Sequence, residues 1–341
     1  MVKTVCFGEI MLRLSPPGFE RLFQSPVLNA TFGGEANVAV SLAQFGFDSG
    51  YVTCLPANPI GDAALRTLRA EGVNVEHIVR GGSRLGIYFA ETGASQRPST
   101  VIYDRAHAAI SELQPGSVPW HDVFDGAQWF HWTGITPALS KSAAECTREA
   151  VEAARRAGAR VSVDLNFRSK LWSSRDAQST MRPLVGGADL LIANEEDLQA
   201  VLGIEIAGTD VTTGSLAVDA YREPAERVAR QHGVARIAVT LRESLSASDN
   251  AWSAVLFNAA TGAFHHSQRY VVRLVDRIGG GDSFAAGLIF ALLSGRDDET
   301  SLRFAVAASA LKQTIPGDFN HVSVAEVERL VAGDASGRVQ R

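Results

Sequence analysis

The sequence contains few cysteines, and they stand far apart: Cys6, Cys54 and Cys146. An odd number of scattered cysteines excludes a disulfide framework and is typical of reduced thiols in the core of a cytosolic protein. No apolar run reaches the roughly 20 residues that span a bilayer, and the first residues lack the pattern of a signal peptide. We therefore expect a cytoplasmic protein with no membrane partner.

The sequence also lacks an excess of basic charge. Its 32 Lys and Arg residues are outnumbered by 37 Asp and Glu residues, which gives a formal net charge of -5. A chain without a basic field has little attraction for a phosphate backbone, so we expect no nucleic-acid partner. Hydrophobic residues make up 46% of the 341 residues, as in an ordinary globular enzyme. This length suits one large domain over residues 1–332, followed by a flexible tail at 333–341.

Apolar and amphipathic runs alternate along most of the chain at the spacing of βαβ units, which predicts an α/β fold. One helix is expected to follow a loop that ends at Gly61 and Asp62, and to close at Gly72. The other expected elements are strands near residues 5–12, 51–55, 128–132, 160–165, 189–193 and 236–241, and helices near residues 38–46, 140–157, 195–202, 224–232 and 284–293.

Residues 75–104 break this alternation. Two short runs at 86–91 and 99–104 are typical of antiparallel strands with a turn between them. With residues 12–14 and about 28–32 they predict a small sheet apart from the main core, built from segments at about 10–32 and 75–104. A sheet this small needs another surface to cover its apolar face.

Three consecutive glycines, Gly279, Gly280 and Gly281, lead into the apolar run at 284–293. Glycine tolerates positive φ, so successive N–H groups can turn toward one point and bind an anion. The helix that follows adds unpaired N–H groups and the positive end of its dipole. Asp282 stands at the start of this helix, either as an N-cap residue or as a general base beside a phosphate-binding turn.

A second pair of glycines, Gly33 and Gly34, also precedes a helix. Glycine lets the backbone approach a ligand closely, and the amide of Asn37 offers both a donor and an acceptor. The chain therefore carries two glycine-rich helix starts, far apart in sequence, that can both approach a ligand.

The two motifs resemble the two signatures of the ribokinase-like (PfkB) carbohydrate kinases, G-G-x-x-N-x-A-x-x-L-A-x-L-G and D-T-x-G-A-G-D-x-F. Phe45, Arg277 and Gly280 stand where Leu, Thr and Ala are usual. The resemblance implies a three-layer α/β/α core with a small β-sheet lid that covers the sugar site and pairs with another subunit of a homo-oligomer. It also implies ATP and Mg²⁺ as cofactors, Asp282 as the general base, and the three glycines as the group that holds charge on the transferred phosphoryl.

The same resemblance implies a phosphoryl and metal site at two strand ends. Asn166 and Arg168 lie in a D-x-N-x-R motif whose Arg is expected close to the transferred phosphoryl group, although a salt-bridged loop Arg is the alternative. Asn194 and Asp197 resemble a motif that holds magnesium through water, with Asp in the slot of a Glu. The alternative is that these acidic residues complement the dipole of a first helical turn.

The nucleotide site departs from the family pattern at Thr240, Arg242 and Glu243, where most members carry a glycine-rich loop. Arg242 either supplies the charge that the lost N–H groups would have given or is an ordinary surface residue, and the preferred nucleotide base stays open. The ATP-binding residues that the resemblance implies are Asn166, Arg168, Asn194, Thr240, Arg242, Glu243, Gly279 and Gly281.

Tyr88, Tyr103 and Arg105 fall on the expected lid strands. A guanidinium with two phenols suits a carboxylate, because the Arg fork binds it with two bonds; an aromatic lid core with a solvated Arg is the alternative. Within the family the chain resembles the 2-keto-3-deoxygluconate kinases, with a neutral-sugar kinase or a non-catalytic sugar-acid sensor as alternatives. The substrate-binding residues that this implies are Gly33, Gly34, Asn37, Tyr88, Tyr103, Arg105, Arg168 and Asp318.

Overall fold

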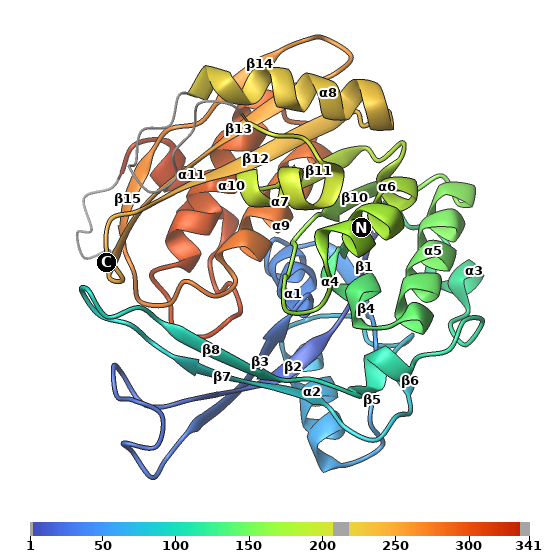
Figure 1. Cartoon of the computed structure of the whole chain (residues 1–341), viewed down its shortest axis with the longest axis vertical. Helices are drawn as coiled ribbons and strands as arrows, with labels where there is room; N and C mark the ends of the chain where they lie inside the picture. The colour runs from blue at the N-terminus through green and yellow to red at the C-terminus, as the bar shows by residue number, and fades with distance from the viewer. Residues whose placement is uncertain (1–2, 207–217, 335–341) are drawn as a thin grey trace.

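A twisted nine-stranded sheet forms the centre of the protein, whose computed structural model describes residues 3–206 and 218–334 (Figure 1). The strand order is β14-β13-β12-β11-β10-β9-β1-β4, with β15 also paired to β13. The parallel strands are β1 (Lys3–Phe7), β4 (Asp48–Val52), β9 (Trp129–Thr133), β10 (Arg160–Asp164), β11 (Leu190–Ala193) and β12 (Arg236–Ser244). The antiparallel strands are β13 (Asp249–Asn258), β14 (Phe264–His266) and β15 (Tyr270–Arg273).

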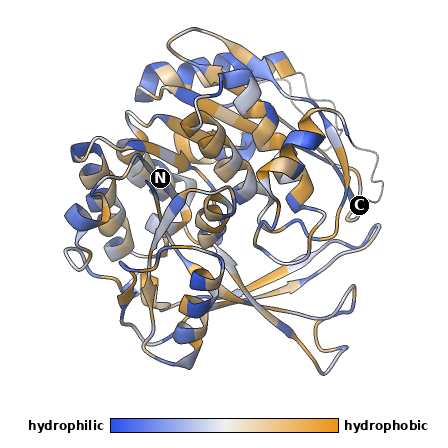
Figure 2. Cartoon of the chain, turned by 180° about the vertical axis from the view of Figure 1, so that it is seen from behind, coloured by the Kyte–Doolittle hydropathy of each residue, from blue (hydrophilic) through white to orange (hydrophobic). Residues whose placement is uncertain are grey.

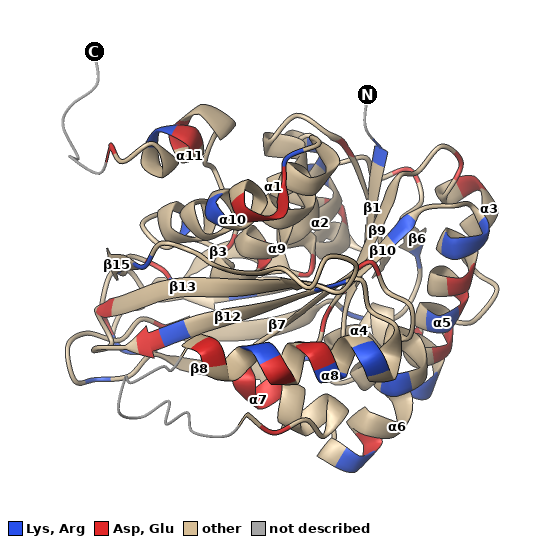
Figure 3. Ribbon diagram, turned by 90° about the horizontal axis from the view of Figure 1, so that it is seen from above, with Lys and Arg blue, Asp and Glu red and all other residues tan. Residues whose placement is uncertain are grey.

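Helices cover both faces of this sheet, which confirms the three-layer α/β/α core (Figure 3). One face packs against α1 (Ala36–Gln44), α2 (Pro59–Ala70), α9 (Gly280–Leu293) and α10 (Asp298–Lys312), with α11 (Val324–Val331) against α10. The other packs against α5 (Lys141–Arg156), α6 (Ser174–Val185) and α8 (Arg222–His232). Short helices are α3 (Trp120–Val123), α4 (Ile135–Leu139) and α7 (Glu195–Asp197). Within the described ranges, no helix has the length and apolar character needed to cross a membrane.

The two helical layers differ in how much of each helix is buried. Figure 2 colours each residue by hydropathy, and hydrophilic residues are frequent on the outer helices of the molecule. α8 buries Pro224, Ala225 and Val228 and turns its charged residues to solvent, as expected of an amphipathic helix. α9 is buried on nearly all sides between the sheet, α1 and α10. A Cβ at Gly287 would come within 3.0 Å of the Ala305 Cα, so this glycine allows α9 and α10 to pack closely. The rigid placement of α9 fixes the position of the glycine turn at its start.

Two expectations about the N-terminal region are wrong. The strand expected at 5–12 is two strands, β1 and β2 (Ile10–Ser15), and β2 belongs to a different sheet. The chain bends at Gly8, where a Cβ would lie 2.5 Å from the Cβ of Glu35, so this crowded position requires glycine. The helix expected after Gly61 and Asp62 begins earlier, at Pro59, because the side chain of Asn58 caps it by accepting from the N–H groups of Ile60 and Gly61.

The expected small sheet is confirmed as a four-stranded lid in the order β3-β2-β7-β8 (Figure 1). Its other strands are β3 (Asn29–Gly34), β7 (Gly86–Glu91) and β8 (Thr100–Asp104); β5 (Cys54–Leu55) and β6 (Val79–Arg80) form a separate pair. The inner face buries Met11, Tyr88 and Ala90. The outer face carries half-buried or exposed apolar side chains that are in register across the four strands: Leu12, Leu14, Phe32, Ile87, Phe89 and Ile102.

We expect this outer face to pair with a second copy of the chain, because water contact with a continuous apolar face is unfavourable. Sedimentation of the purified protein at micromolar concentration should show a dimer or larger. Ile102, 49% exposed on β8, is the site to test: Ile102→Glu should shift the protein toward monomer. Ile60→Glu, at an exposed apolar position of α2 outside the lid strands, should not. A monomeric wild-type protein would contradict the pairing.

Candidate functional site

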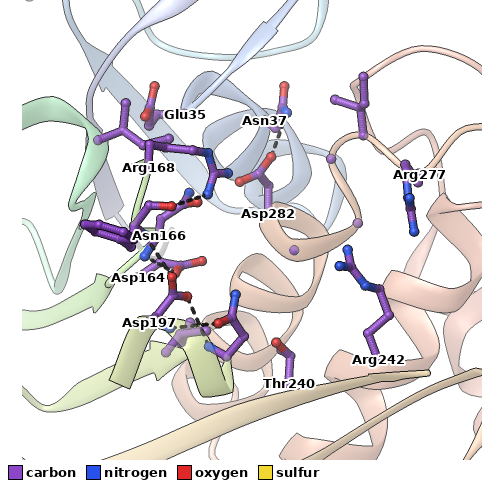
Figure 4. Close-up of a pocket in the computed structure, with 18 of the residues that line it drawn as sticks. Glu35, Asn37, Asp164, Asn166, Arg168, Asp197, Thr240, Arg242, Arg277 and Asp282 are labelled. Atoms are coloured by element: carbon purple, nitrogen blue, oxygen red, sulfur yellow. Dashed lines mark hydrogen bonds between the residues drawn. The ribbon is translucent and has the colours of Figure 1, made fainter. Parts of the chain in front are cut away.

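A cleft of about 670 Å³ lies between the carboxyl ends of the parallel strands and the inner face of the lid. This is the edge at which open α/β sheets bind their ligands. Figure 4 shows the cleft with Asp282 in the middle, Asp164, Asn166, Arg168 and Asp197 on one side, and Arg242 and Arg277 on the other. The predicted site residues that line it are Gly34, Asn37, Tyr88, Tyr103, Arg105, Asn166, Arg168, Asn194, Asp197, Thr240, Arg242, Gly279, Gly280, Gly281, Asp282 and Asp318.

The glycine turn (Gly279, Gly280 and Gly281) has the geometry of an anion cradle. Gly279 is the N-cap of α9 with a φ of 82°, a conformation that favours glycine. In the first turn of a helix the N–H groups, here those of Gly281 and Asp282, have no carbonyl four residues earlier to bond. A Cβ added at Gly281 would meet no atom within 4 Å, so the space in front of this residue is open to a ligand.

Asp282 is the third residue of α9, so the interpretation of Asp282 as its N-cap is wrong. Its carboxylate accepts a 2.7 Å hydrogen bond from the Asn37 Nδ2, which joins the two glycine-rich helix starts. Burial raises the pKa of Asp282 to about 6, and the Asn37 bond opposes that rise. A carboxylate with a pKa near neutrality is suited to accept a proton.

A buried ion network lies between the lid and the glycine turn, and the sequence analysis missed its central residue, Arg13. Arg13 of β2 contacts the carboxylates of Asp276 at 2.7 Å and Asp318 at 2.8 Å. Asp318 also accepts a 2.5 Å hydrogen bond from the Tyr88 hydroxyl. Gly33, expected to bind substrate, lies outside the lining of the cleft: a Cβ there would overlap the Asp318 side chain at 1.8 Å. Tyr88 and Asp318 are therefore tied to this network rather than free in the cleft.

Arg105 follows β8 and is only 9% exposed, so the alternative of a solvated Arg is wrong. It forms an ion pair with Glu9, a residue that the sequence analysis missed, and its guanidinium lies 5.2 Å from the centre of the Tyr103 ring. Its buried Nε has no hydrogen-bond partner among the described residues. Burial raises the pKa of Glu9 to about 7, against the lowering effect of Arg105. Arg105 also lines the cleft, so the part of its guanidinium that Glu9 does not bind can meet a ligand there.

The end of β10 brings two further polar groups into the cleft. Asn166 has a φ of 39°, uncommon for a residue with a side chain, and its N–H donates to the Asp164 carboxylate at 3.1 Å. Arg168 donates to the adjacent carbonyl of Phe167 and lines the cleft. It forms no salt bridge with any residue of 3–206 or 218–334, so the described part of the chain does not support the alternative of a salt-bridged Arg. Burial, and then the charges of Asp197 and Asp282, raise the pKa of Asp164 well above its usual value.

Asn194 and Asp197 form a capping box at the start of α7, which supports the structural alternative for these residues. The carboxylate oxygens of Asp197 accept from the N–H groups of Asn194 at 3.1 Å and Phe167 at 2.9 Å. Burial raises the pKa of Asp197 to about 6. No group of three or more His, Cys, Asp or Glu side chains able to hold a metal occurs in the described residues. Asn194 and Asp197 therefore fit Mg²⁺ only through water molecules. Such a water would donate a hydrogen bond to a remaining lone pair of the Asp197 carboxylate oxygens.

On the opposite side of the cleft, Arg242 of β12 lies near Arg277, which stands two residues before the glycine turn (Figure 4). Both guanidiniums line the cleft, and burial and then the Arg242 charge lower the pKa of Arg277. Arg242 is thus a cleft residue. Glu243, expected at the ATP site, lies outside the cleft because it turns away and binds Arg269 with two hydrogen bonds of 2.9 and 2.8 Å. Alternate residues of a strand point to opposite faces, which accounts for both positions.

The comparisons with known proteins agree with this geometry. The pfkB family of carbohydrate kinases matches residues 1–321. The solved structure of a 2-dehydro-3-deoxygluconokinase from Thermotoga maritima is 49% identical, with a TM-score of 0.93, over 98% of this chain and 100% of that chain. A 2-dehydro-3-deoxygalactonokinase from Haloferax volcanii is 35% identical over 98% of both chains. A fructokinase from Klebsiella pneumoniae is 31% identical over 84% of this chain and 82% of its own.

The family match covers nearly the whole chain and includes both glycine-rich helix starts, the lid strands and the strand ends that form the cleft. The chain belongs to the pfkB family of carbohydrate kinases and is a phosphotransferase that acts on an alcohol group.

Proposed function

We propose that the protein is an ATP-dependent sugar-acid kinase that phosphorylates the terminal hydroxyl of 2-keto-3-deoxygluconate, also named 2-dehydro-3-deoxygluconate, to give 2-keto-3-deoxy-6-phosphogluconate. The observation that carries the proposal is the buried guanidinium of Arg105 on the inner side of the lid. The names of the relatives from Thermotoga maritima and Haloferax volcanii support the same class of substrate. They differ in the sugar, so the gluconate form and the galactonate form are both candidates.

A carboxylate is the ligand that best fits the environment of Arg105. The guanidinium is buried, only one of its edges is used by Glu9, and Tyr103 lies against it. A neutral sugar offers only hydroxyl groups to the part of the guanidinium that Glu9 does not bind, whereas a carboxylate can accept two charge-assisted bonds from the fork. Glu9, with its pKa raised to about 7, can take up a proton when the substrate carboxylate arrives.

Asp282 is the proposed general base. Its carboxylate removes the proton from the terminal hydroxyl as the hydroxyl oxygen attacks the γ-phosphorus of ATP. The bond from that phosphorus to the bridging oxygen breaks, and ADP leaves with the electron pair. The unpaired N–H groups at Gly281 and Asp282 face the open side of the turn, where they stabilise the charge that develops on the phosphoryl oxygens. Arg168 lies in the same cleft and adds positive charge.

The nucleotide phosphates are proposed to lie beside Arg242 and Arg277. Two guanidiniums in one cleft repel each other unless an anion lies between them, and a triphosphate supplies that anion. Asn166, Asn194 and Thr240 line the same cleft. Mg²⁺ would be held through water by Asn194 and Asp197 and would offset the charge of the phosphates when it is bound.

The fructokinase relative keeps a neutral-sugar kinase as the second candidate. A non-catalytic sugar-acid sensor on the same scaffold would need neither a base nor a cradle. Asp282 and the glycine turn both line the cleft, which favours an enzyme over a sensor. The acid substrate and the role of Asp282 can be tested separately.

Arg105→Leu should raise KM for 2-keto-3-deoxygluconate by about 10- to 150-fold, because it removes a charge-assisted contact of roughly 1.5–3 kcal/mol. Arg105→Lys should recover only part of the loss, since an ammonium cannot form the two-pronged contact. Steady-state kinetics on the acid, and on any neutral sugar that the enzyme accepts, measure the effect.

The matched control is Glu9→Gln, which removes the partner of Arg105 and keeps the guanidinium; its KM for the acid should rise far less than that of Arg105→Leu. Equal losses on acid and neutral substrates in Arg105→Leu would mean that Arg105 only holds the lid in place.

Asp282→Asn should lower kcat by at least ~10²-fold, the range of general-base loss, with an unchanged melting temperature. The amide keeps the volume of the side chain and can still accept the Asn37 bond, but it cannot take a proton. In the wild type, Asp282 is ionised above its pKa of about 6, so kcat/KM should fall as the pH drops through 6. The remaining activity of the variant should lack that limb. Near-normal turnover in the variant would remove Asp282 from the mechanism.

A further inference from the structure

Lys312, the last residue of α10, is fully buried directly behind the glycine turn. Its ammonium donates to three main-chain carbonyls: Asp276 at 3.3 Å, Gly317 at 2.6 Å, and Ile278. An ammonium has three protons and no acceptor, so the three carbonyls satisfy it completely. Burial lowers the pKa of Lys312, opposed by the charges of Asp276 and Asp318.

Burying an ammonium is costly unless all its hydrogen bonds are made. Two of the acceptors, the carbonyls of Asp276 and Ile278, come from the segment that leads into the glycine turn, and the third comes from the loop after α10. Their convergence on one positive charge is the arrangement by which carbonyl oxygens replace the hydration shell of a monovalent cation such as K⁺.

The position of this cation bears directly on the cradle. A Cβ at Gly279 would lie 3.2 Å from the Lys312 Cε, so the lysine stem packs against the first glycine of the turn. In a trans peptide the C=O and N–H groups point in opposite directions. Because the Ile278 carbonyl points at Lys312, the N–H of Gly279 in the same peptide points away from it, and Gly279 lines the cleft.

We propose that Lys312 is a positioning residue: a tethered monovalent cation that holds the glycine turn in its anion-binding conformation. It makes turnover independent of free K⁺ or NH₄⁺ and does not itself touch the substrate. The proposal rests on the proposed kinase function only for its activity readout.

The test removes the tether and supplies a free cation. Lys312→Ala leaves a space beside three carbonyls, so kcat should fall by about 10-fold or more through misplacement of the turn, with a smaller change in the KM of the sugar acid. NH₄⁺ or K⁺ at about 0.1 M should restore a large part of kcat, and tetramethylammonium at the same ionic strength should not, because it is too large for the space. ATP is added as its Tris salt so that no alkali cation enters with it.

Two controls complete the experiment. Lys312→Met fills the space with an uncharged side chain, so it should show the loss of kcat without rescue by any salt. The wild type should respond equally to the three salts. If Lys312→Ala does not fold, the Met variant decides: wild-type kcat in that variant would overturn the proposal, as would equal rescue of Lys312→Ala by all three salts.

A second readout is independent of the reaction. The melting temperature of Lys312→Ala should rise with NH₄⁺ or K⁺ more than with tetramethylammonium, and that of Lys312→Met should not. This selective shift would hold even if the sugar acid proved to be the wrong substrate. If this selective shift is absent and NH₄⁺ and K⁺ also fail to restore turnover, the proposed cation site is wrong. The proposed kinase function would not be affected by that result.

Discussion

Opposite charges buried behind the glycine turn hold the active site together. The carboxylate of Asp276 accepts from Arg13 of the lid and from the N–H groups of Ile278 and Gly317, and the ammonium of Lys312 binds carbonyls of the same residues. The Asp276 carboxylate thus fixes N–H groups around the glycine turn, and the Lys312 ammonium fixes carbonyls of the same residues. Removing one partner of a buried ion pair costs roughly 3–5 kcal/mol, so this segment resists displacement, and the first turn of α9 stays directed at the cleft.

The same network links the lid to the chemistry. Arg13 lies on β2, and its second carboxylate, Asp318, also receives the Tyr88 hydroxyl from β7. The inner lid face is therefore bonded to the segment that leads into the glycine turn, while the outer face carries apolar side chains of which Ile102 is exposed. The substrate then enters a site whose walls are already fixed, which lowers the ordering cost of binding. Arg105, Arg242 and Arg277 all supply positive charge to the cleft.

Much of the fold followed from local pattern, because the strands of a parallel sheet are buried runs and the helices between them are amphipathic or buried. The strands near residues 128–132, 160–165 and 236–241 and the four-stranded lid were predicted on this basis. The break at Gly8 was missed because an apolar run continues through it, and only the crowding against Glu35 reveals it. Arg13 was missed because its partners lie far away in sequence: Arg13 and Asp318 are 305 residues apart. Lys312 was missed because two of its three acceptors, the carbonyls of Asp276 and Ile278, belong to a segment 36 and 34 residues earlier. A buried Lys or Arg has no local sequence signal that separates it from a surface one.

The assignment of the cleft to a sugar acid is tested most directly by measuring ATP consumption with 2-keto-3-deoxygluconate, 2-keto-3-deoxygalactonate, ribose and fructose under identical conditions. A carboxylate bound to Arg105 by a charge-assisted contact should give at least one of the two acids a kcat/KM about 10-fold or more above either neutral sugar. A kcat/KM for ribose or fructose that equals or exceeds both acids would contradict the assignment of the cleft to a sugar acid.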